Sequence, residues 1–506
     1  MVKGSVQLDG EKGGLLVASG ARSPQNSNGT LFLCCGVALL AALSMGFALG
    51  YSSPADVDLT KSGILNESEA SWFSSLLNIG AVMGGPIAGY LLGKMGRKIT
   101  LMMVSLPFVA GWVLLAACET VAPLYIGRIL TGIGAGMASL ITPVYIAEMS
   151  SPQLRGLLGA SFQLIITAGI LIVYALGIAF NHVWLAITGG CLAALLVVLM
   201  LPMPESPRFY LIRHQREKAL EILRWLRGPS ADIDAECREV EDALDNSNEK
   251  FSMKEFTNPS LFKPLLISIA LMIFQQCSGI NAVMFNAKDI MAAAVTGISA
   301  DVATVILAAV QVGATFLSVV LMDVAGRRIL LTVAGVSMAI SSATFGLYFQ
   351  LKQGNHNNGT NLTGDFIDGM LDGGSNEPNL SWLSLISLVV YIIGFSIGWG
   401  PIPWLLMSEI FPSKARGAAS AIATATNWMF AFIVTVSFKS MENALTDQGV
   451  FWLYSGVCVL SIIFVLLFVP ETKGKTLEEI EAEFQSGSRH VRLETDPNDY
   501  NPDRGS

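Results

Sequence analysis

Long apolar runs recur along this 506-residue chain, and they constrain its fold more than any other feature. A run of roughly 20 apolar residues is long enough to cross a lipid bilayer as a helix. Such runs lie at residues 31–51, 71–92, 99–118, 123–147, 157–179, 183–202, 263–287, 301–322, 329–350, 382–407, 417–438 and 450–469. With 52% hydrophobic and only 14% charged residues, the chain is too apolar for an ordinary soluble protein. The sequence therefore predicts an all-α membrane protein with twelve transmembrane helices.

The polar segments around these runs divide the chain. A charged stretch separates the sixth run from the seventh and leaves two groups of six spans. The expected organisation is a tail at 1–30, a six-helix bundle at 31–202, a loop at 203–262, a second six-helix bundle at 263–469 and a tail at 470–506. Helical spacing of apolar residues between 215 and 226 predicts short amphipathic helices in the loop. Residues 1–30 contain no apolar core, so we expect no cleaved signal peptide.

Basic residues predict the orientation of the spans. Lys94, Arg97 and Lys98 follow the second span, and Arg327 and Arg328 follow the eighth, all in short loops of one face. Because short cytosolic loops carry an excess of Lys and Arg, both termini are expected in the cytosol. The loops after spans one and nine then face the other side. These loops contain the glycosylation acceptor sequences at Asn66, Asn358, Asn361 and Asn379, any one of which could arise by chance.

Charged motifs near the predicted cytosolic ends of spans repeat between the two halves. The residues are Arg97, Glu148, Arg155, Glu205 and Arg208 in the first half and Arg327, Glu409, Arg416 and Glu471 in the second. A repeat of two six-helix halves is an arrangement that places a substrate site near the bilayer midplane. We expect these charges to form ion pairs that latch the halves together when the protein faces outward. The alternative is that they only set the membrane topology.

Neutral amide side chains are the main polar groups inside the predicted spans. They are Gln163, Gln275, Gln276, Asn281, Gln311 and Asn427, with Trp404 and Trp428 nearby. Amides suit a solute whose hydroxyls both donate and accept hydrogen bonds, and an aromatic ring suits a solute that has a C–H face. A lone amide in a span more often makes a structural bond between helices. Three amides around Gly279, however, predict a broken helix that lines a cavity.

The chain resembles the sugar porters of the major facilitator superfamily. The resemblance covers residues 31–484 and rests on five motifs: Gly127-Arg128, Pro204-Glu-Ser-Pro-Arg208, Gln275-Gln-Cys-Ser-Gly-Ile-Asn281, Gly400-Pro-Ile-Pro-Trp404 and Pro470-Glu-Thr-Lys-Gly474. It is most similar to the intracellular, dileucine-bearing branch of the animal facilitative hexose transporters. The resemblance implies the major facilitator fold and transport of glucose or a related hexose by alternating access.

The resemblance also assigns roles to individual positions. The residues that match sugar-contacting positions of the family are Gln163, Gln275, Gln276, Asn281 and Trp404. Gln311 stands where many members have Asn, and Ser396 stands where several have Glu. Pro401 and Pro403 kink the tenth span, because proline removes a helical hydrogen bond. The resemblance makes this segment a gate over the pocket.

Ionisable groups distinguish a uniporter from a proton-coupled carrier. Coupling to protons requires a titrating group within the membrane. Proton-coupled relatives have an Asp in span one, whereas Ala48 lies in the matching segment here. We therefore expect uniport, with Arg128 as a structural cation. The alternatives are a proton-coupled sugar symporter of endolysosomal membranes and a sugar sensor that does not transport.

Other function classes find less support. No nucleophile, general base and orienting group can be placed in one cavity, so an enzyme is not expected, and neither is a cofactor, a metal or a nucleic-acid partner. The expected partners are the sugar, the bilayer and clathrin adaptor complexes. Adaptors read an acidic dileucine motif of the form present at Glu11, Leu15 and Leu16, although such a string can occur by chance. The motif predicts residence in endosomes or lysosomes, with the plasma membrane as a second location.

Overall fold

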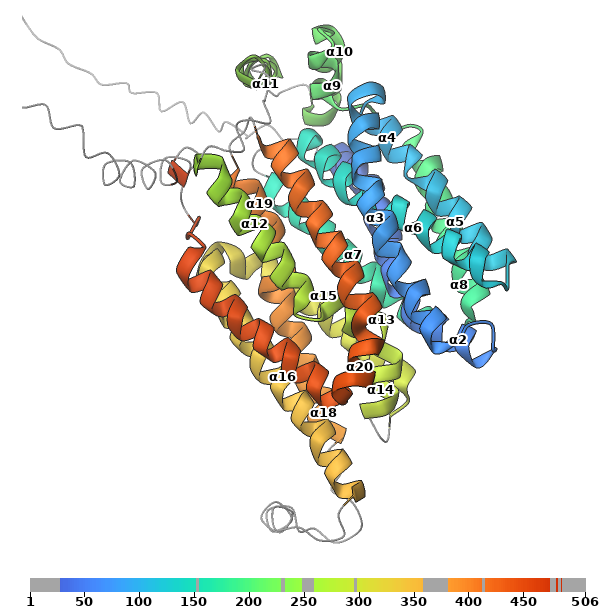
Figure 1. Ribbon diagram of the computed structural model, residues 1–506. Coiled ribbons are helices and arrows are strands. Elements are labelled where there is room, and N and C mark those ends of the chain that lie inside the picture. Colours follow the sequence, from blue (N-terminus) through green and yellow to red (C-terminus); the bar gives the residue numbers. More distant parts are fainter. Residues whose placement is uncertain are drawn as a thin grey trace, which may run out of the picture.

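The computed structural model describes residues 28–151, 154–228, 233–247, 259–294, 298–357, 381–411, 415–473, 479–480 and 484. Their regular secondary structure is entirely helical, and eleven candidate membrane spans occur among them (Figure 1). The last span covers 52 residues. At about 1.5 Å per residue it would be more than twice the thickness of a bilayer core. It turns at Thr446, whose φ of 65° and ψ of 166° are not helical, so the described chain contains twelve segments long enough to cross a membrane, the predicted number.

The first half contains eight helices. They are α1 (Asn28–Gly50), α2 (Ser52–Lys61), α3 (Glu67–Met95), α4 (Arg97–Met103), α5 (Ser105–Ala117), α6 (Val121–Met149), α7 (Arg155–Leu176) and α8 (His182–Met200). Helix α2 continues the first span beyond Gly50, since the candidate span runs from Gly29 to Lys61. Helices α4 and α5 together form the third span.

The second half follows three short helices of the central loop. These are α9 (Pro207–Ile212), α10 (Arg216–Arg227) and α11 (Ile233–Ser247). The second half comprises α12 (Pro259–Cys277), α13 (Ile280–Phe285), α14 (Ala287–Ala294), α15 (Ala300–Ala325), α16 (Arg327–Asn357), α18 (Ser381–Gly394), the π-helix η2 (Phe395–Trp399), α19 (Ile402–Ile410) and α20 (Arg416–Phe468). The predicted amphipathic helix near residues 215–226 is confirmed as α10.

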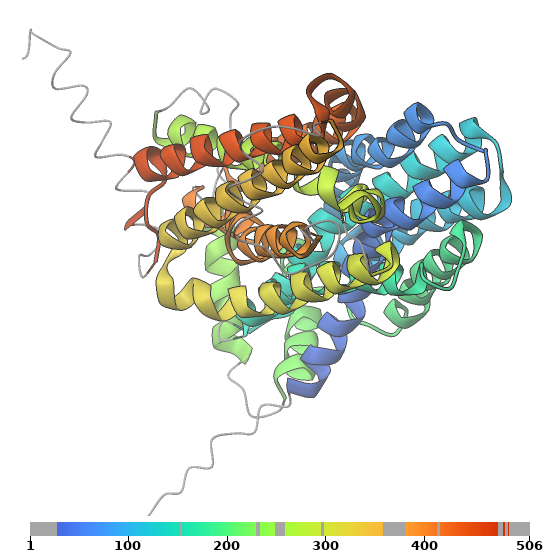
Figure 2. The ribbon, with the colours of Figure 1, turned by 90° about the horizontal axis from the view of Figure 1, so that it is seen from below.

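The two halves pack side by side (Figure 2), and their contacts follow the internal repeat. Helix α3 packs against α20, and α7 packs against α15. These helices are the second, eleventh, fifth and eighth spans. In the two-fold repeat, span two corresponds to span eight and span five to span eleven, so the two contacts are equivalent. The interface therefore has the two-fold character that the repeated motifs predict.

Hydrogen bonds between the halves lie toward the end of the bundle that is remote from α9, α10 and α11. Asn78 Nδ2 donates to Thr435 Oγ1 at 3.1 Å, and the Tyr174 hydroxyl donates to the Met284 carbonyl at 2.5 Å. The backbone N–H of Lys288 on α14 donates to Ser53 Oγ on α2 at 3.0 Å. No hydrogen bond between described residues joins the halves at the opposite end, where α4 and α19 lie.

Close packing of α3 on α6 depends on glycine. A Cβ atom on Gly132 would overlap the carbonyl oxygen of Leu77, and one on Gly136 would overlap that of Ala81. Without side chains at these positions, the two backbones approach directly, as small residues allow in membrane helices. Gly132 and Gly136 of span four therefore serve helix contact.

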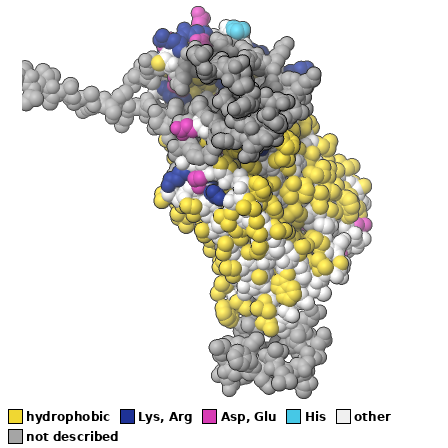
Figure 3. All heavy atoms as spheres, turned by 60° about the vertical axis from the view of Figure 1, so that its left-hand side comes forward, with side chains coloured by type: hydrophobic (Ala, Val, Ile, Leu, Met, Phe, Trp, Pro, Cys, Tyr) yellow, Lys and Arg dark blue, Asp and Glu magenta, His cyan; other side chains and the backbone are white. Residues whose placement is uncertain are grey.

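The sides of the bundle are apolar. Large hydrophobic side chains remain exposed there, including Leu106 on α5, Phe316 on α15 and Leu467 on α20. Figure 3 shows such side chains spread over the middle of the molecule, with Lys and Arg gathered toward one end. This distribution suits a protein whose sides contact lipid.

Several predicted features lie outside the described residues. These are Glu11, Leu15 and Leu16 of the sorting motif and the acceptors Asn358, Asn361 and Asn379. Arg155 and Arg416 begin α7 and α20, but their side chains lie outside the described part of the structure.

Candidate functional site

A break in the seventh span organises the candidate site. Helix α12 ends at Cys277 and α13 begins at Ile280. Gly279 between them has a φ of 93°, a left-handed conformation that glycine adopts without strain. A Cβ there would also overlap the ring of Tyr454. The predicted break at Gly279 is confirmed, and it brings Asn281 back toward the end of α12.

Four amide side chains around this break form a chain of hydrogen bonds. Asn281 Nδ2 donates to Gln276 Oε1 at 2.7 Å, and Gln276 Nε2 donates to Asn427 Oδ1 at 3.1 Å. Asn427 Nδ2 then donates to Gln275 Oε1 at 2.6 Å. Helices α12, α13 and α20 therefore place four of the predicted substrate-binding residues in mutual contact, all in the second half.

The amide chain ends at the broken tenth span. Gln275 Nε2 donates to the carbonyl oxygens of Trp399 at 2.7 Å and Gly400 at 3.0 Å. The span changes there from α18 into the π-helix η2 and resumes as α19 at Ile402. The kink that Pro401 and Pro403 predict is confirmed.

The other three predicted substrate-binding residues lie on different helices. Gln163 is half-buried on α7, Gln311 is buried on α15, and Trp404 is half-buried on α19. Among the described residues, none of them hydrogen-bonds to the four amides, and Gln311 Oε1 has no hydrogen-bond partner. The side chain of Gln311 is thus a buried polar group with an unused acceptor.

The chemistry of the four amides is that of an uncharged polar site. Each amide presents both a donor and an acceptor, and no ionised side chain in the described part of the chain bonds to them. Such groups can exchange their mutual bonds for bonds to hydroxyls. A hollow of 790 Å³ lies elsewhere, near Asp289, Lys439 and Glu442, and the four amides do not line it. A second gap, between Val283 and Tyr454, leaves no room for a water molecule.

A second polar cluster lies at the end of the first half near α9. Arg97 pairs with Glu148 through two bonds of 2.7 and 2.8 Å, and Ser206 Oγ donates to Glu148 Oε2 at 2.6 Å. The carboxylate of Glu205 accepts from the backbone N–H groups of Arg97 and Lys98, which begin α4. Glu205 therefore stabilises the N-terminus of α4.

The second half repeats this cluster. Arg327 pairs with Glu409 at 3.0 Å, and Thr472 Oγ1 donates to Glu409 Oε2 at 2.6 Å. Glu471 accepts from the backbone N–H groups of Arg327 and Arg328, each at 3.0 Å. Each residue thus has a counterpart in the first cluster with the same contact.

These contacts differ from the expected latch in one respect. Every described ion pair of the two clusters joins helices of one half, so none joins the halves to each other. The predicted latch would require contacts that this conformation does not contain among its described residues. Arg208 is exposed on α9.

Comparison with known proteins identifies the family of the chain. A family model described as "Sugar (and other) transporter" matches residues 34–484. The chain belongs to the sugar transporter family. A relative from Bos taurus, the facilitated glucose transporter member 8 of solute carrier family 2, is 41% identical over 475 residues, with 93% of this chain and 97% of the relative covered. The facilitated trehalose transporter Tret1 of Bombyx mori is 37% identical over 455 residues, covering 90% and 86%.

Solved structures agree with this assignment. The inward open xylose transporter XylE from E. coli is 28% identical, with a TM-score of 0.72 over 90% of this chain and 99% of that one. Another structure of XylE, titled as a proton:xylose symporter, matches equally well. This member of the sugar transporter family therefore has the major facilitator fold, is a multi-pass membrane protein and is not an enzyme.

The sugar transporter also contains a buried carboxylate that the sequence interpretation missed. Asp56 lies on α2 and is only 7% exposed. Its Oδ2 atom accepts from Ser74 Oγ, and its Oδ1 atom has no hydrogen-bond partner among the described residues. The apolar run was taken to end at Tyr51, but no charged residue lies between Tyr51 and Asp56. The absence of charge in this interval was the sequence signal that the helix continues.

Arg128 on α6 lies in the same region of this transporter and is fully buried. It donates to the carbonyl oxygens of Phe73 at 3.2 Å and Ala48 at 3.1 Å and to the hydroxyl of Ser52. Its partners are neighbouring groups, as expected of a structural cation. From the first span, the Ser52 hydroxyl and the Tyr51 ring face it, whereas Ala48 contributes its carbonyl.

Asn66 is the one predicted glycosylation acceptor among the described residues. It is exposed and forms the N-cap of α3, where its side chain accepts from the N–H of Glu69 at 2.9 Å. The Glu69 side chain accepts in turn from the N–H of Asn66 at 2.9 Å. This capping box leaves the Asn66 amide nitrogen available on the surface.

Proposed function

We propose that this sugar transporter moves glucose or a related hexose down its gradient by alternating access. The observation that carries the proposal is the chain of four uncharged amides at the breaks in spans seven and ten. Neutral amides suit a neutral, polyhydroxylated solute, because each can donate and accept. The name of the Bos taurus relative supports a glucose-like substrate. The name of the Bombyx mori relative makes a disaccharide the alternative substrate.

The proposed pocket includes the amide chain and three further groups. Gln275, Gln276, Asn281 and Asn427 would contact sugar hydroxyls, joined by Gln163, Gln311 and Trp404 from facing helices. The buried, unused acceptor of Gln311 supports its inclusion, because an unsatisfied buried acceptor costs free energy until a ligand supplies a donor.

The arrangement of the halves supports an inward-facing state. If the basic end of the bundle lies in the cytosol, the hydrogen-bonded end of the interface is the outer one. The outer side is then closed, as in an inward-facing carrier. In the outward-facing state, the clusters of Arg97, Glu148 and Glu205 and of Arg327, Glu409 and Glu471 would approach each other. With Arg155, Arg208 and Arg416, they would form the latch.

A proton-coupled symporter is the second candidate, and Asp56 favours it. A carboxylate buried in the first span beside Arg128 is the kind of group that coupling requires. Asp56, however, does not touch the amide chain, and it lies at the end of the span near α3 rather than near the sugar pocket. Uniport therefore remains the proposal.

The substrate proposal is tested by tracer uptake with the purified protein in liposomes. The panel contains glucose, fructose, galactose, xylose and trehalose, each competed with unlabelled sugar. We expect saturable hexose uptake that unlabelled hexose inhibits. Saturable binding in detergent without flux for any sugar would instead indicate a sensor, and flux of trehalose alone would replace the hexose assignment.

Location and modification are proposed from the sequence. Glu11, Leu15 and Leu16 would bind clathrin adaptors and keep the protein in endosomes or lysosomes. Glycans would be attached at Asn66, Asn358, Asn361 or Asn379 on the non-cytosolic side. Changing Leu15 and Leu16 together to Ala should move the protein to the cell surface, and continued vesicular location would exclude this motif as the sorting signal.

A further inference from the structure

The broken tenth span contains two carbonyl groups whose α-helical donors are missing. In an α-helix, the N–H of each residue donates to the carbonyl four residues earlier. Pro401 and Pro403 have no N–H, so they cannot donate to the carbonyls of Ile397 and Trp399. A buried carbonyl without a donor destabilises the conformation that contains it.

Two neighbouring helices supply donors to these same two carbonyls. Ser318 Oγ on α15 donates to the Ile397 carbonyl at 2.8 Å. Gln275 Nε2 on α12 donates to the Trp399 carbonyl at 2.7 Å. Ser318 is only 1% exposed, and Gln275 is 2% exposed, so both donor side chains are shielded from water. Each proline is thus matched by one side-chain donor from a different helix, and Gln275 Nε2 also donates to the Gly400 carbonyl at 3.0 Å.

The third neighbour, α16, fixes the segment by close packing. The indole N–H of Trp399 donates to the Leu331 carbonyl at 3.1 Å. A Cβ on Gly398 would approach Ala334 Cβ to 2.5 Å. The segment is therefore held from three sides, but only Ser318 and Gln275 replace donors that the prolines remove.

We propose that Ser318 is a positioning residue of the gate, which holds the Ile397 carbonyl in place of the missing N–H of Pro401. Gln275 likewise holds the Trp399 carbonyl in place of the missing N–H of Pro403. The proposed function also assigns Gln275 to the sugar pocket. A sugar that takes the Gln275 amide then weakens one of the two bonds, while Ser318 keeps the other. Sugar binding is thereby linked to the bend of span ten, although Ser318 never touches the sugar.

A double-mutant cycle tests the pairing of Ser318 with Pro401. In Pro401→Ala, the new N–H can donate to the Ile397 carbonyl once the π-helical turn η2 takes α-helical register. Ser318→Ala should lower the unfolding midpoint in detergent by roughly 1–3 °C alone, and by less in the Pro401→Ala background. In the Pro403→Ala background its effect should be undiminished. An equal loss in all three backgrounds would overturn the proposal.

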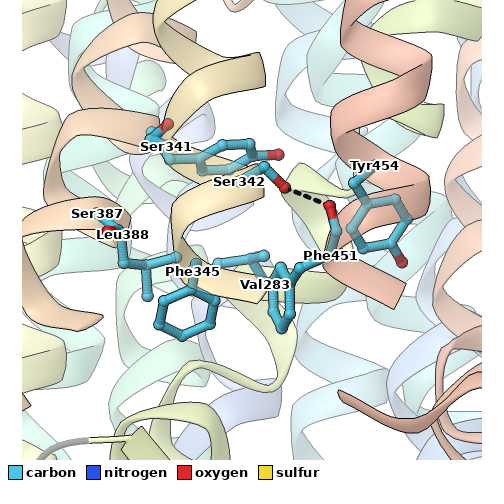
Figure 4. Close-up of a pocket in the computed structure, with 9 residues that line it drawn as sticks. Val283, Ser341, Ser342, Phe345, Ser387, Leu388, Phe451 and Tyr454 are labelled. Carbon is cyan, nitrogen blue, oxygen red and sulfur yellow. Dashed lines mark hydrogen bonds between the residues drawn. The ribbon is translucent and has the colours of Figure 1, made fainter. Parts of the chain in front are cut away.

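Ser342→Ala is the matched control. Ser342 on α16 is buried and donates to the Phe451 carbonyl of α20 at 2.8 Å (Figure 4), the same bond length as for Ser318. The residue four positions after Phe451 is Ser455, which keeps its N–H. The effect of Ser342→Ala should therefore be the same with and without Pro401. A dependence on Pro401 equal to that of Ser318→Ala would also overturn the proposal.

Sugar flux provides a second readout in case a proline variant does not fold. Ser318→Ala should lower the maximal rate of hexose exchange in liposomes about fivefold relative to Ser342→Ala. The sugar dissociation constant should stay within about twofold of the unmutated protein, because Ser318 lies outside the pocket. Equal rates in the two variants would contradict the proposal. If the unmutated protein shows no flux, the proposed function fails, while the unfolding cycle still decides the role of Ser318.

Discussion

At Gln276, both ends of a single side-chain amide are engaged by other amides. Its oxygen accepts from Asn281 and its nitrogen donates to Asn427. An isolated amide in a membrane helix serves well as a structural bond between helices, but a chain of them offers several bonds that a ligand can replace. The residue type thus suggests the chemistry, and the number of amides in contact indicates a binding site.

Asn281→Ala is the first prediction at this scale. Loss of the side chain should weaken hexose binding by about 1–3 kcal/mol, because a donor to Gln276 and a proposed sugar contact both disappear. The measurement is the sugar dissociation constant in detergent. Asn286→Ala is the control, since among the described residues Asn286 Nδ2 donates only to the Ala282 carbonyl of the preceding helix α13. Equal effects of the two variants would remove Asn281 from the pocket.

Glu205 and Glu471 occupy equivalent positions, but their pKa values shift in opposite directions. Burial raises the pKa of Glu205 above its usual value, despite donors such as the N–H of Ser206. Burial also acts to raise the pKa of Glu471, but backbone N–H groups of Lys473, Arg327 and neighbouring residues outweigh it, and the pKa is lowered. The folded state thus favours ionised Glu471 and disfavours ionised Glu205.

Glu471→Gln should therefore lower the unfolding midpoint at neutral pH more than Glu205→Gln does. The contribution of ionised Glu471 is present above the pKa of the unfolded chain and is lost as the pH falls through the lower folded pKa. The difference between Glu471→Gln and the unmutated protein should narrow below about pH 4. Thermal unfolding across pH measures this, and a larger cost for Glu205→Gln at pH 7 would contradict it.

At the scale of elements, the helices follow closely from the sequence. Backbone polar groups in lipid must find partners within the protein, so apolar runs of about 20 residues form membrane-spanning helices. The breaks at Gly279 and before Pro401 were predictable from residue type. The continuation of the first span to Asp56 was not predicted, because polar Ser52 and Ser53 interrupt the apolar run. Those serines face buried groups, which only the fold reveals.

The contact of α3 with α6 provides the prediction at this scale. Gly136→Ala places a methyl group against the carbonyl of Ala81 and should destabilise the protein by about 1–3 kcal/mol. Gly93→Ala on α3 adds the same methyl group where no atom lies within 4 Å, and alanine favours the helix there. Thermal unfolding in detergent compares them. If Gly93→Ala destabilises the protein as much as Gly136→Ala does, close packing does not explain why residue 136 is glycine.

At the scale of the whole molecule, the repeated motifs predicted two equivalent halves, and the paired contacts of α3 with α20 and α7 with α15 follow that symmetry. The sequence could not show which conformation the chain adopts. That choice depends on contacts between the halves, such as Asn78 with Thr435, which are far apart in the chain and belong to no motif. In this conformation the charged residues pair within each half, and the latch between the halves in the outward-facing state stays a prediction.

The substrate site shows a similar division between sequence and fold. Residue types and motifs identified Gln275, Gln276, Asn281 and Asn427, and the fold brings these four together. Their connection to the Trp399 carbonyl could not be predicted, because it depends on a π-helical turn. Uniport is therefore expected from the uncharged groups at the pocket and from the separation of the Asp56 carboxylate from them.

The most direct test of uniport is the final level of tracer glucose inside liposomes that contain the purified protein, with and without an inward proton gradient. The account predicts that the internal concentration rises to the external concentration and stops there. Addition of a protonophore should leave that level unchanged. Accumulation above the external concentration that collapses with the protonophore would contradict the account and assign proton coupling to this protein.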